Sequence, residues 1–136
     1  MFVESAPIAK VDVLVNNAGV LLNERSETSH GLEQTLATNL VGPLTLTAML
    51  LPLLRKGSRS RVIWVSSGGM YAKSLDVDAL YDPPSPFDGV AAYAQTKRAM
   101  VVLNELLAEA LAAHGIASHC MHPVSYTHLR AHETRP

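Results

Sequence analysis

Three short apolar runs recur along the chain at intervals of about fifty residues. They occupy residues 11–15, 60–67 and 116–122 and are rich in valine, isoleucine and leucine. Continuous runs of this kind are typical of strands inside a parallel sheet. The third run is the weakest, because it contains two histidines.

Two longer stretches between these runs repeat apolar positions at helical spacing. We predict helices over residues 31–56 and 93–114, with Gly57 and Gly115 standing just after their ends. Residues 68–92 have no such period, so we predict a loop there. Strands that alternate with helices favour an α/β fold with a parallel sheet.

Composition narrows the classes of function. The chain has 136 residues, of which 48% are hydrophobic and 17% are charged, and this suits one globular domain. The net charge of −1 provides no basic surface for nucleic acid. The single cysteine, Cys120, excludes an internal disulfide and suits a reducing, intracellular compartment. Residues 1–10 lack the pattern of a signal peptide, and the apolar run 40–54 is too short and interrupted to predict a membrane span.

Tyr93 and Lys97 are the first candidates for chemistry. They are four residues apart at the start of a predicted helix, so their side chains share one face. A free phenol has a pKa of about 10, and a neighbouring ammonium lowers it toward the range of a useful acid or base. The same spacing also occurs in ordinary surface pairs, so the pair needs support from elsewhere in the chain.

That support comes from motifs at the ends of the predicted strands. NNAG follows the first strand, TNLVG lies in the first helix, VSS ends the second strand, and YAQTK opens the second helix. In this order they resemble the short-chain dehydrogenase/reductase family from about residue 11 to residue 123. The long stretch between Ser67 and Tyr93 is most similar to the retinol-dehydrogenase-like branch.

The resemblance implies a partial Rossmann-like doubly wound parallel sheet, with about three strands and two long helices. It implies NAD or NADP as cofactor and a small-molecule alcohol or carbonyl as substrate. The analogy with the branch, together with apolar residues in the loop, implies a lipophilic substrate. These loop residues are Leu75, Leu80, Tyr81 and Phe87.

The resemblance also implies a role for each motif. Tyr93 would exchange a proton with the substrate oxygen, and Lys97 would assist it and contact the nicotinamide ribose. Ser67, rather than Ser66, would hydrogen-bond the substrate oxygen. The residues implied on the cofactor side are Asn16, Asn17, Ala18, Gly19, Lys97 and Pro123.

Asn39 has a signature of its own. Pro43 follows it by four residues and has no N–H, so the Asn39 carbonyl lacks its ordinary helical partner. The resemblance implies that this carbonyl holds a water that relays protons to Lys97. A helix that is only disturbed at this point is the simpler alternative.

Part of the family pattern is missing from this sequence. No set of its glycines fits the phosphate-binding turn TGxxxGxG, and the pattern begins just before the family's fourth strand. We therefore divide the chain into residues 1–123, the C-terminal part of a Rossmann-type domain, and residues 124–136, a disordered tail foreign to the family. We expect this chain alone to be catalytically incompetent. The alternative function is a non-catalytic fragment that acts through helices 31–56 and 93–114, which in the family build a homodimer interface.

A cluster of histidines raises the question of a metal site. Zinc accepts histidine and cysteine ligands, but no second cysteine pair or acidic partner supports a site here. The alternation of side chains along a strand also separates neighbouring ligands. We therefore predict no metal. The residues concerned are His119, Cys120, His122, His128 and His132.

Overall fold

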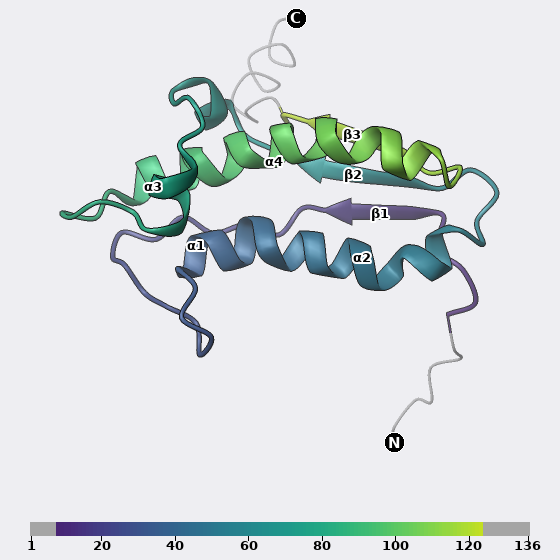
Figure 1. The fold of residues 1–136 in the computed structure, drawn as a ribbon, viewed down its shortest axis with the longest axis horizontal. Coiled ribbons are helices and arrows are strands. Elements are labelled where there is room, and N and C mark those ends of the chain that lie inside the picture. The colour runs from purple at the N-terminus through teal and green to yellow at the C-terminus, as the bar shows by residue number, and fades with distance from the viewer. Residues whose placement is uncertain (1–7, 124–136) are drawn as a thin grey trace, which may run out of the picture.

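A computed structural model describes residues 8–123, which form a three-stranded parallel sheet with two long helices beside it (Figure 1). The strands are β1 (Val13–Asn16), β2 (Arg61–Val65) and β3 (Ala117–Met121), in the order β1-β2-β3. Both neighbouring pairs run parallel. The predicted strands and the predicted parallel α/β arrangement are therefore confirmed.

Only one face of the sheet is covered among the described residues. Val62 of β2 pairs with Leu14 on one side and with Ser118 on the other, and this row packs under the helices. The alternate residues Val13 and Val15 are 49% and 51% exposed. Continuous apolar strands are normally buried on both faces. Here the second face of the sheet stays open.

The helix predicted over 31–56 is one continuous helical stretch with an irregular middle. It consists of α1 (Gln34–Leu36), a π-helical turn (Ala37–Val41) and α2 (Gly42–Leu54). The N–H of Gly42 donates to the carbonyl of Ala37, five residues back, which widens the turn around Asn39. The expected disturbance before Pro43 is therefore confirmed.

This stretch also bears on the membrane prediction. Residues Gln34–Leu54 form 21 helical residues with a mean hydropathy of 1.5, long and apolar enough to cross a membrane. The expectation that the segment is too short and too interrupted is therefore wrong as to its length. The evidence for a membrane helix is weak, because core helices of soluble proteins have the same length and composition. Leu54, at its end, is fully buried against the sheet.

The second long helix, α4, spans Gly89–Ala112 and begins four residues before Tyr93. Asp88 explains this early start, because its carboxylate accepts hydrogen bonds from the N–H groups of Val90 and Ala91, both at 3.0 Å. Tyr93 thus lies one turn inside the helix rather than at its first residue. Gly115, with φ of +73°, ends the connection into β3.

Residues 68–92 are more ordered than the predicted loop. A 3₁₀ turn occupies Gly68–Tyr71, and a short helix, α3, occupies Val77–Tyr81. Asp76 caps α3 by accepting the N–H of Ala79 at 3.1 Å. The loop prediction is wrong in these two segments, because elements this short depend on caps and contacts rather than on a long hydrophobic period.

The main core lies between the covered sheet face and the two long helices. Trp64, on the central strand, is fully buried, and its indole N–H donates to Ser118 Oγ at 3.0 Å. Ser118 Oγ in turn donates to Asn104 Oδ1 of α4 at 2.8 Å. This core fixes α4, and with it Tyr93 and Lys97, against β2 and β3. Its buried members are Leu54, Val62, Trp64, Met100, Leu111 and Ile116.

Candidate active site

Three residues from separate parts of the sequence meet beyond the carboxyl end of β1. A Cβ placed on Gly19 would stand 3.2 Å from Lys97 Nζ and 3.4 Å from Asn39 Oδ1. The glycine therefore leaves room for the lysine ammonium beside the backbone that follows β1. Three of the predicted site residues come together here, at the edge where open parallel sheets bind ligands.

Lys97 is held in a defined position. Its side chain is 3% exposed, and Nζ donates to the carbonyl of Val65, at the end of β2, at 2.9 Å. Burial lowers the pKa of Lys97, and the neighbouring Cys120 thiol partly opposes that shift. Nζ lies 5.6 Å from the centre of the Tyr93 ring, within the range of a cation–π contact. The phenol and the ammonium therefore lie side by side, as their spacing predicts.

Asn39 is fully buried in the π-helical turn, and its side chain makes three hydrogen bonds. Its Oδ1 accepts the N–H of Val20 at 2.7 Å, and its Nδ2 donates to the carbonyl of Val20 at 2.9 Å. The same Nδ2 donates to Thr96 Oγ1, on α4, at 3.1 Å. The sequence interpretation concerned the main-chain carbonyl of Asn39. The side chain has a separate role, because its hydrogen bonds tie the segment after β1 to α4.

The two serines at the end of β2 differ in orientation. Ser66 is 3% exposed, and its hydroxyl donates to the carbonyl of Lys97 at 2.9 Å. Ser67 is half-buried, and its Oγ accepts the N–H of Gly69 in a long contact of 3.4 Å. A Cβ on Gly69 would stand 3.9 Å from both Ser67 Oγ and Tyr93 Cδ1, so these two groups flank the same glycine.

The NNAG segment lines a cavity of about 310 Å³ beside α2. Asn16 is 3% exposed, and its Nδ2 donates to Thr47 Oγ1 at 3.0 Å. Its Oδ1 is buried and has no hydrogen-bond partner among residues 8–123. A buried oxygen of this kind normally accepts a hydrogen bond, and a bound ligand could donate it. Asn16, Asn17 and Ala18 all line the cavity, whereas Gly19 faces Lys97.

These observations test the fit of a nicotinamide cofactor. The ribose and nucleoside side of such a group suits two features of the described residues. One is the space at Gly19 beside the Lys97 ammonium, and the other is the side-chain oxygen Oδ1 of Asn16, which has no partner there. The glycine-rich turn that would hold its pyrophosphate is not in this sequence. The residues present therefore fit part of the cofactor.

The last of the predicted cofactor residues, Pro123, is exposed and lies two residues after the end of β3. It is also the last described residue, so the predicted tail 124–136 lies outside the described part. Within residues 8–123, no group of three or more histidine, cysteine or acidic side chains could hold a metal ion. His128 and His132 of the histidine cluster lie outside that range.

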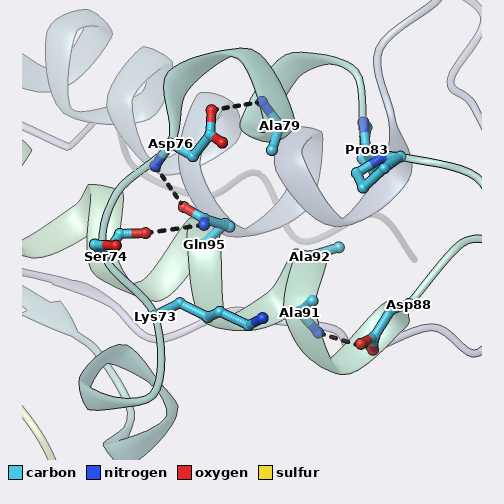
Figure 2. A pocket seen from close by; sticks show the side chains of 10 residues that line it. Lys73, Ser74, Asp76, Ala79, Pro83, Asp88, Ala91, Ala92 and Gln95 are labelled. Carbon is cyan, nitrogen blue, oxygen red and sulfur yellow. Dashed lines mark hydrogen bonds between the residues drawn. The ribbon is translucent and has the colours of Figure 1, made fainter.

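A second cavity, of about 320 Å³, opens on another face of α4 (Figure 2). On α4 it is lined by Ala91, Ala92 and Gln95, whereas Tyr93 and Lys97 do not line it. Gln95 Oε1 accepts the N–H of Asp76 at 3.0 Å, and its Nε2 donates to the carbonyl of Ser74 at 2.9 Å. The amide therefore holds the segment before α3 against α4.

The apolar residues of the 68–92 segment do not form a substrate wall as a group. Leu80 is 7% exposed and packs with Leu36 of α1 and Ala99 of α4, and Leu75 packs against the same cluster. Tyr81, by contrast, is 62% exposed. Leu75 and Leu80 therefore give no support to a lipophilic substrate, because they form the small core that attaches α3.

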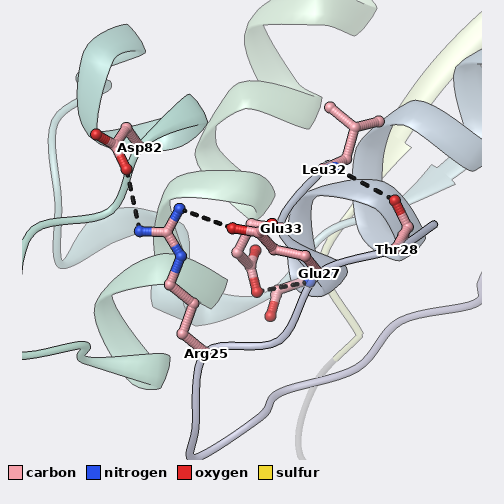
Figure 3. A network of polar contacts seen from close by, with 7 residues as sticks. Arg25, Glu27, Thr28, Leu32, Glu33 and Asp82 are labelled. Carbon is pink, nitrogen blue, oxygen red and sulfur yellow. Dashed lines mark hydrogen bonds and ion pairs between the residues drawn. The ribbon is translucent and has the colours of Figure 1, made fainter. Parts of the chain in front are cut away.

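An ion-pair network joins this segment to the one that follows β1 (Figure 3). Arg25 donates to Asp82 Oδ1 at 3.0 Å and to Glu27 Oε1 at 3.2 Å. The hydrogen bond with Asp82 raises the pKa of Arg25. Glu33 lies beside this network and caps α1. The segment that follows β1 and the segment that follows β2 are thus linked through Arg25 and Asp82.

Sequence reasoning missed two positioning residues. Thr96 is 1% exposed; its hydroxyl donates to the carbonyl of Tyr93 at 2.8 Å and receives the Asn39 bond. Gly89 faces the carbonyl of Leu22 so closely that any Cβ there would overlap it. Thr96 lies inside the YAQTK motif, which is a usable signal. The Gly89 contact joins segments far apart in the sequence, and no local pattern signals it.

The comparisons with known proteins now decide the family. The family model described as short chain dehydrogenase matches residues 3–81, more than half of the chain. The chain belongs to the short-chain dehydrogenase family. This confirms the resemblance seen in its motifs, and with it the partial Rossmann fold class.

Two curated relatives refine this assignment. Dehydrogenase/reductase SDR family member 12 from Bos taurus is 47% identical over 113 residues, which are 83% of this chain and 35% of that protein. Retinol dehydrogenase 13 from Homo sapiens is 35% identical over 124 residues, which are 90% of this chain and 38% of that protein. The predicted similarity to the retinol-dehydrogenase-like branch is thereby confirmed. The chain spans little more than a third of either relative.

A solved structure extends the likeness to three dimensions. The Pseudomonas aeruginosa RhlG/NADP active-site complex superposes with a TM-score of 0.64 at 25% sequence identity. The superposition covers 94% of this chain and 48% of RhlG. Family membership and this complex together support a nicotinamide cofactor in general.

Proposed function

We propose that this chain carries the proton-transfer half of an NAD(P)-dependent oxidoreductase that interconverts an alcohol and a carbonyl compound. One observation carries the proposal: a buried ammonium, Lys97, lies 5.6 Å from the centre of the Tyr93 ring, which flanks Gly69 together with Ser67. A proton donor, a fixed cation and a hydroxyl therefore surround one small region. A carbonyl oxygen reduced there would meet the phenol and the hydroxyl, with the cation beside the phenol.

The proposed roles follow from these positions. The Tyr93 phenol gives its proton to the substrate oxygen during reduction and takes it back during oxidation. Lys97 stabilises the phenolate left behind, and its remaining N–H donors reach toward the ribose. Ser67 donates to the substrate oxygen and orients it. When bound, the nicotinamide supplies or accepts the hydride.

Asn39 has two proposed contributions. Its side chain fixes Val20 and Thr96, and through them the positions of Gly19 and Tyr93. Its main-chain carbonyl, in the widened π-helical turn, is the proposed site of a water that relays protons to Lys97. The cofactor contacts proposed beside it are those of the NNAG segment, Lys97 and Pro123.

The substrate class rests on relatives rather than on a cavity. Retinol is the substrate that the name of Retinol dehydrogenase 13 gives, and retinol is lipophilic. We therefore propose a lipophilic alcohol or carbonyl substrate for the complete protein.

The test uses a chimera in which residues 8–123 replace the matching segment of Dehydrogenase/reductase SDR family member 12, hereafter the chimera. We expect it to reduce retinal or a similar lipophilic aldehyde with NADH or NADPH. Tyr93→Phe should lower the rate by roughly 10²- to 10⁴-fold, because the proton donor is removed. Tyr81→Phe is the matched control, because Tyr81 is 62% exposed on α3. Full activity of Tyr93→Phe would overturn the proposal.

A second function is favoured by exposed apolar side chains on the two long helices. Met49 and Leu46 of α2 are 72% and 45% exposed, and Leu106 of α4 is 72% exposed. We propose that these faces form a homodimer interface, with or without catalysis. In the chimera, Met49→Lys with Leu106→Lys should convert a dimer to a monomer in sedimentation analysis. An unchanged sedimentation coefficient would exclude this interface.

A further inference from the structure

Two consecutive glycines after Ser67 are enclosed by side chains from different elements. A Cβ on Gly68 would stand 3.2 Å from Nε2 and 3.3 Å from Cε1 of His122, the residue after β3. A Cβ on Gly69 would stand 3.9 Å from the Tyr93 ring of α4. The backbone after Ser67 thus runs past the His122 ring at Gly68 and past the Tyr93 ring at Gly69. A Cβ as close to His122 as the one built at 68 favours glycine there.

The end of β3 holds this backbone at two successive residues. The N–H of Ser66 donates to the carbonyl of Met121 at 2.8 Å, and the ring of the next residue, His122, lies within 3.2 Å of the place where a Cβ on Gly68 would stand. Ser67 lies between these two attachments, in an extended conformation with φ of −149° and ψ of 156°. From there it caps the 3₁₀ turn, in which the N–H of Met70 donates to the Ser67 carbonyl at 3.0 Å.

We propose that His122 is a positioning residue for Ser67. Its imidazole packs edge-on against Gly68 and limits the movement of the turn, so that the Ser67 hydroxyl stays on the Tyr93 side of Gly69. The role rests on the proposed function, in which Ser67 orients the substrate oxygen. It depends on the shape of the ring, and no proton transfer by His122 is involved.

The role of the His122 ring can be tested by substitutions that either remove the ring or keep its flat shape. In the chimera, His122→Ala removes the contact with Gly68, whereas His122→Phe keeps a flat ring and removes both nitrogens. We expect His122→Ala to lower kcat roughly ten- to a hundredfold, because small misplacements of orienting groups have effects of that order. The KM for the nicotinamide cofactor should stay unchanged, and His122→Phe should restore most of kcat. If His122→Phe is as impaired as His122→Ala, the ring nitrogens act instead, and the proposal is wrong.

A second measurement does not depend on activity. Hydrogen exchange of the amides of Met70 and Ala72, which bond within the turn, reports its mobility directly. We expect faster exchange in His122→Ala than in wild type, and wild-type exchange in His122→Phe. Equal exchange in all three proteins would overturn the inference even if the chimera is active. An inactive chimera would count against the proposed function, and the exchange result would still decide the role of His122.

Discussion

The ammonium of Lys97 lies 5.6 Å from the centre of the Tyr93 ring and is anchored at 2.9 Å to the carbonyl of Val65. One helix thus contributes both groups, and the neighbouring strand holds one of them in place. A lysine only 3% exposed loses the hydration of its charge, and this lowers its pKa. The arrangement proposed for proton transfer therefore costs stability.

That cost gives the first prediction. In the chimera, Lys97→Met should raise the free energy of unfolding by about 1 kcal/mol at neutral pH, because an unpaired buried charge is replaced by an apolar chain. The same change should abolish activity. Denaturant unfolding and steady-state kinetics measure the two effects. Lys73→Met, at an exposed lysine, is the control.

The effect should also depend on pH. The folded-state pKa of Lys97 is lowered from its ordinary value of 10.5, so the unfolded chain binds more protons between the two values. Wild-type stability therefore gains from this group as pH rises through that window. The advantage of Lys97→Met should shrink accordingly toward pH 10.5. An advantage that grows with pH would contradict the burial of a charged Lys97.

The second prediction concerns Gly89. Any side chain at this position meets the carbonyl of Leu22, and the Asp88 cap at the start of α4 limits the movement of the Gly89 backbone away from it. Gly89→Ala should lower the free energy of unfolding of the chimera by about 1–3 kcal/mol. Gly69→Ala is the matched control, because its nearest neighbours are 3.9 Å away. Thermal unfolding of both variants measures the difference, and equal midpoints would contradict the close approach.

The third prediction concerns the cofactor. The 136-residue chain alone should bind NADH and NADPH weakly or not at all, because its sequence lacks the glycine-rich turn for the pyrophosphate. Fluorescence titration of both dinucleotides measures this, with the chimera as the binding control. A dissociation constant in the low micromolar range for the chain alone would refute the prediction.

The fourth prediction concerns the edge strand β1 and the uncovered face of the sheet. In the described structure β1 pairs only with β2, and Val13 and Val15 are about half exposed. Open apolar edges pair with other chains. The 136-residue chain alone should therefore self-associate or lack a sharp thermal transition. Val13→Lys with Val15→Lys should reduce the association, as measured by sedimentation.

Met49→Lys distinguishes the two possible causes of association, because Met49 is an exposed residue of the proposed helical interface on α2 and lies away from the strands. If it dissolves the assembly and the valine changes do not, the helices and not the strand edge cause the association. A monomer with a sharp, cooperative thermal transition at high protein concentration would contradict the fourth prediction altogether.

Local sequence was sufficient for the strands, for the two long helices and for part of the site. Hydrophobic periodicity and capping residues predict the strands and the two long helices, and the missing N–H of Pro43 predicts the disturbance before it. All of these signals act within a few residues. The pairing of Tyr93 with Lys97 follows from helical spacing in the same way. Motif order then placed Gly19, Asn39 and Ser67 near that pair.

Tertiary structure decided which groups those residues face. Ser66 turns inward to the Lys97 carbonyl while Ser67 stays beside Gly69, although the two are adjacent and identical in type. Leu75 and Leu80 belong to a core around Leu36 rather than to a substrate wall. Such outcomes depend on contacts between segments tens of residues apart. Periodicity and caps carry no information about them, because those signals arise only from neighbours along the chain.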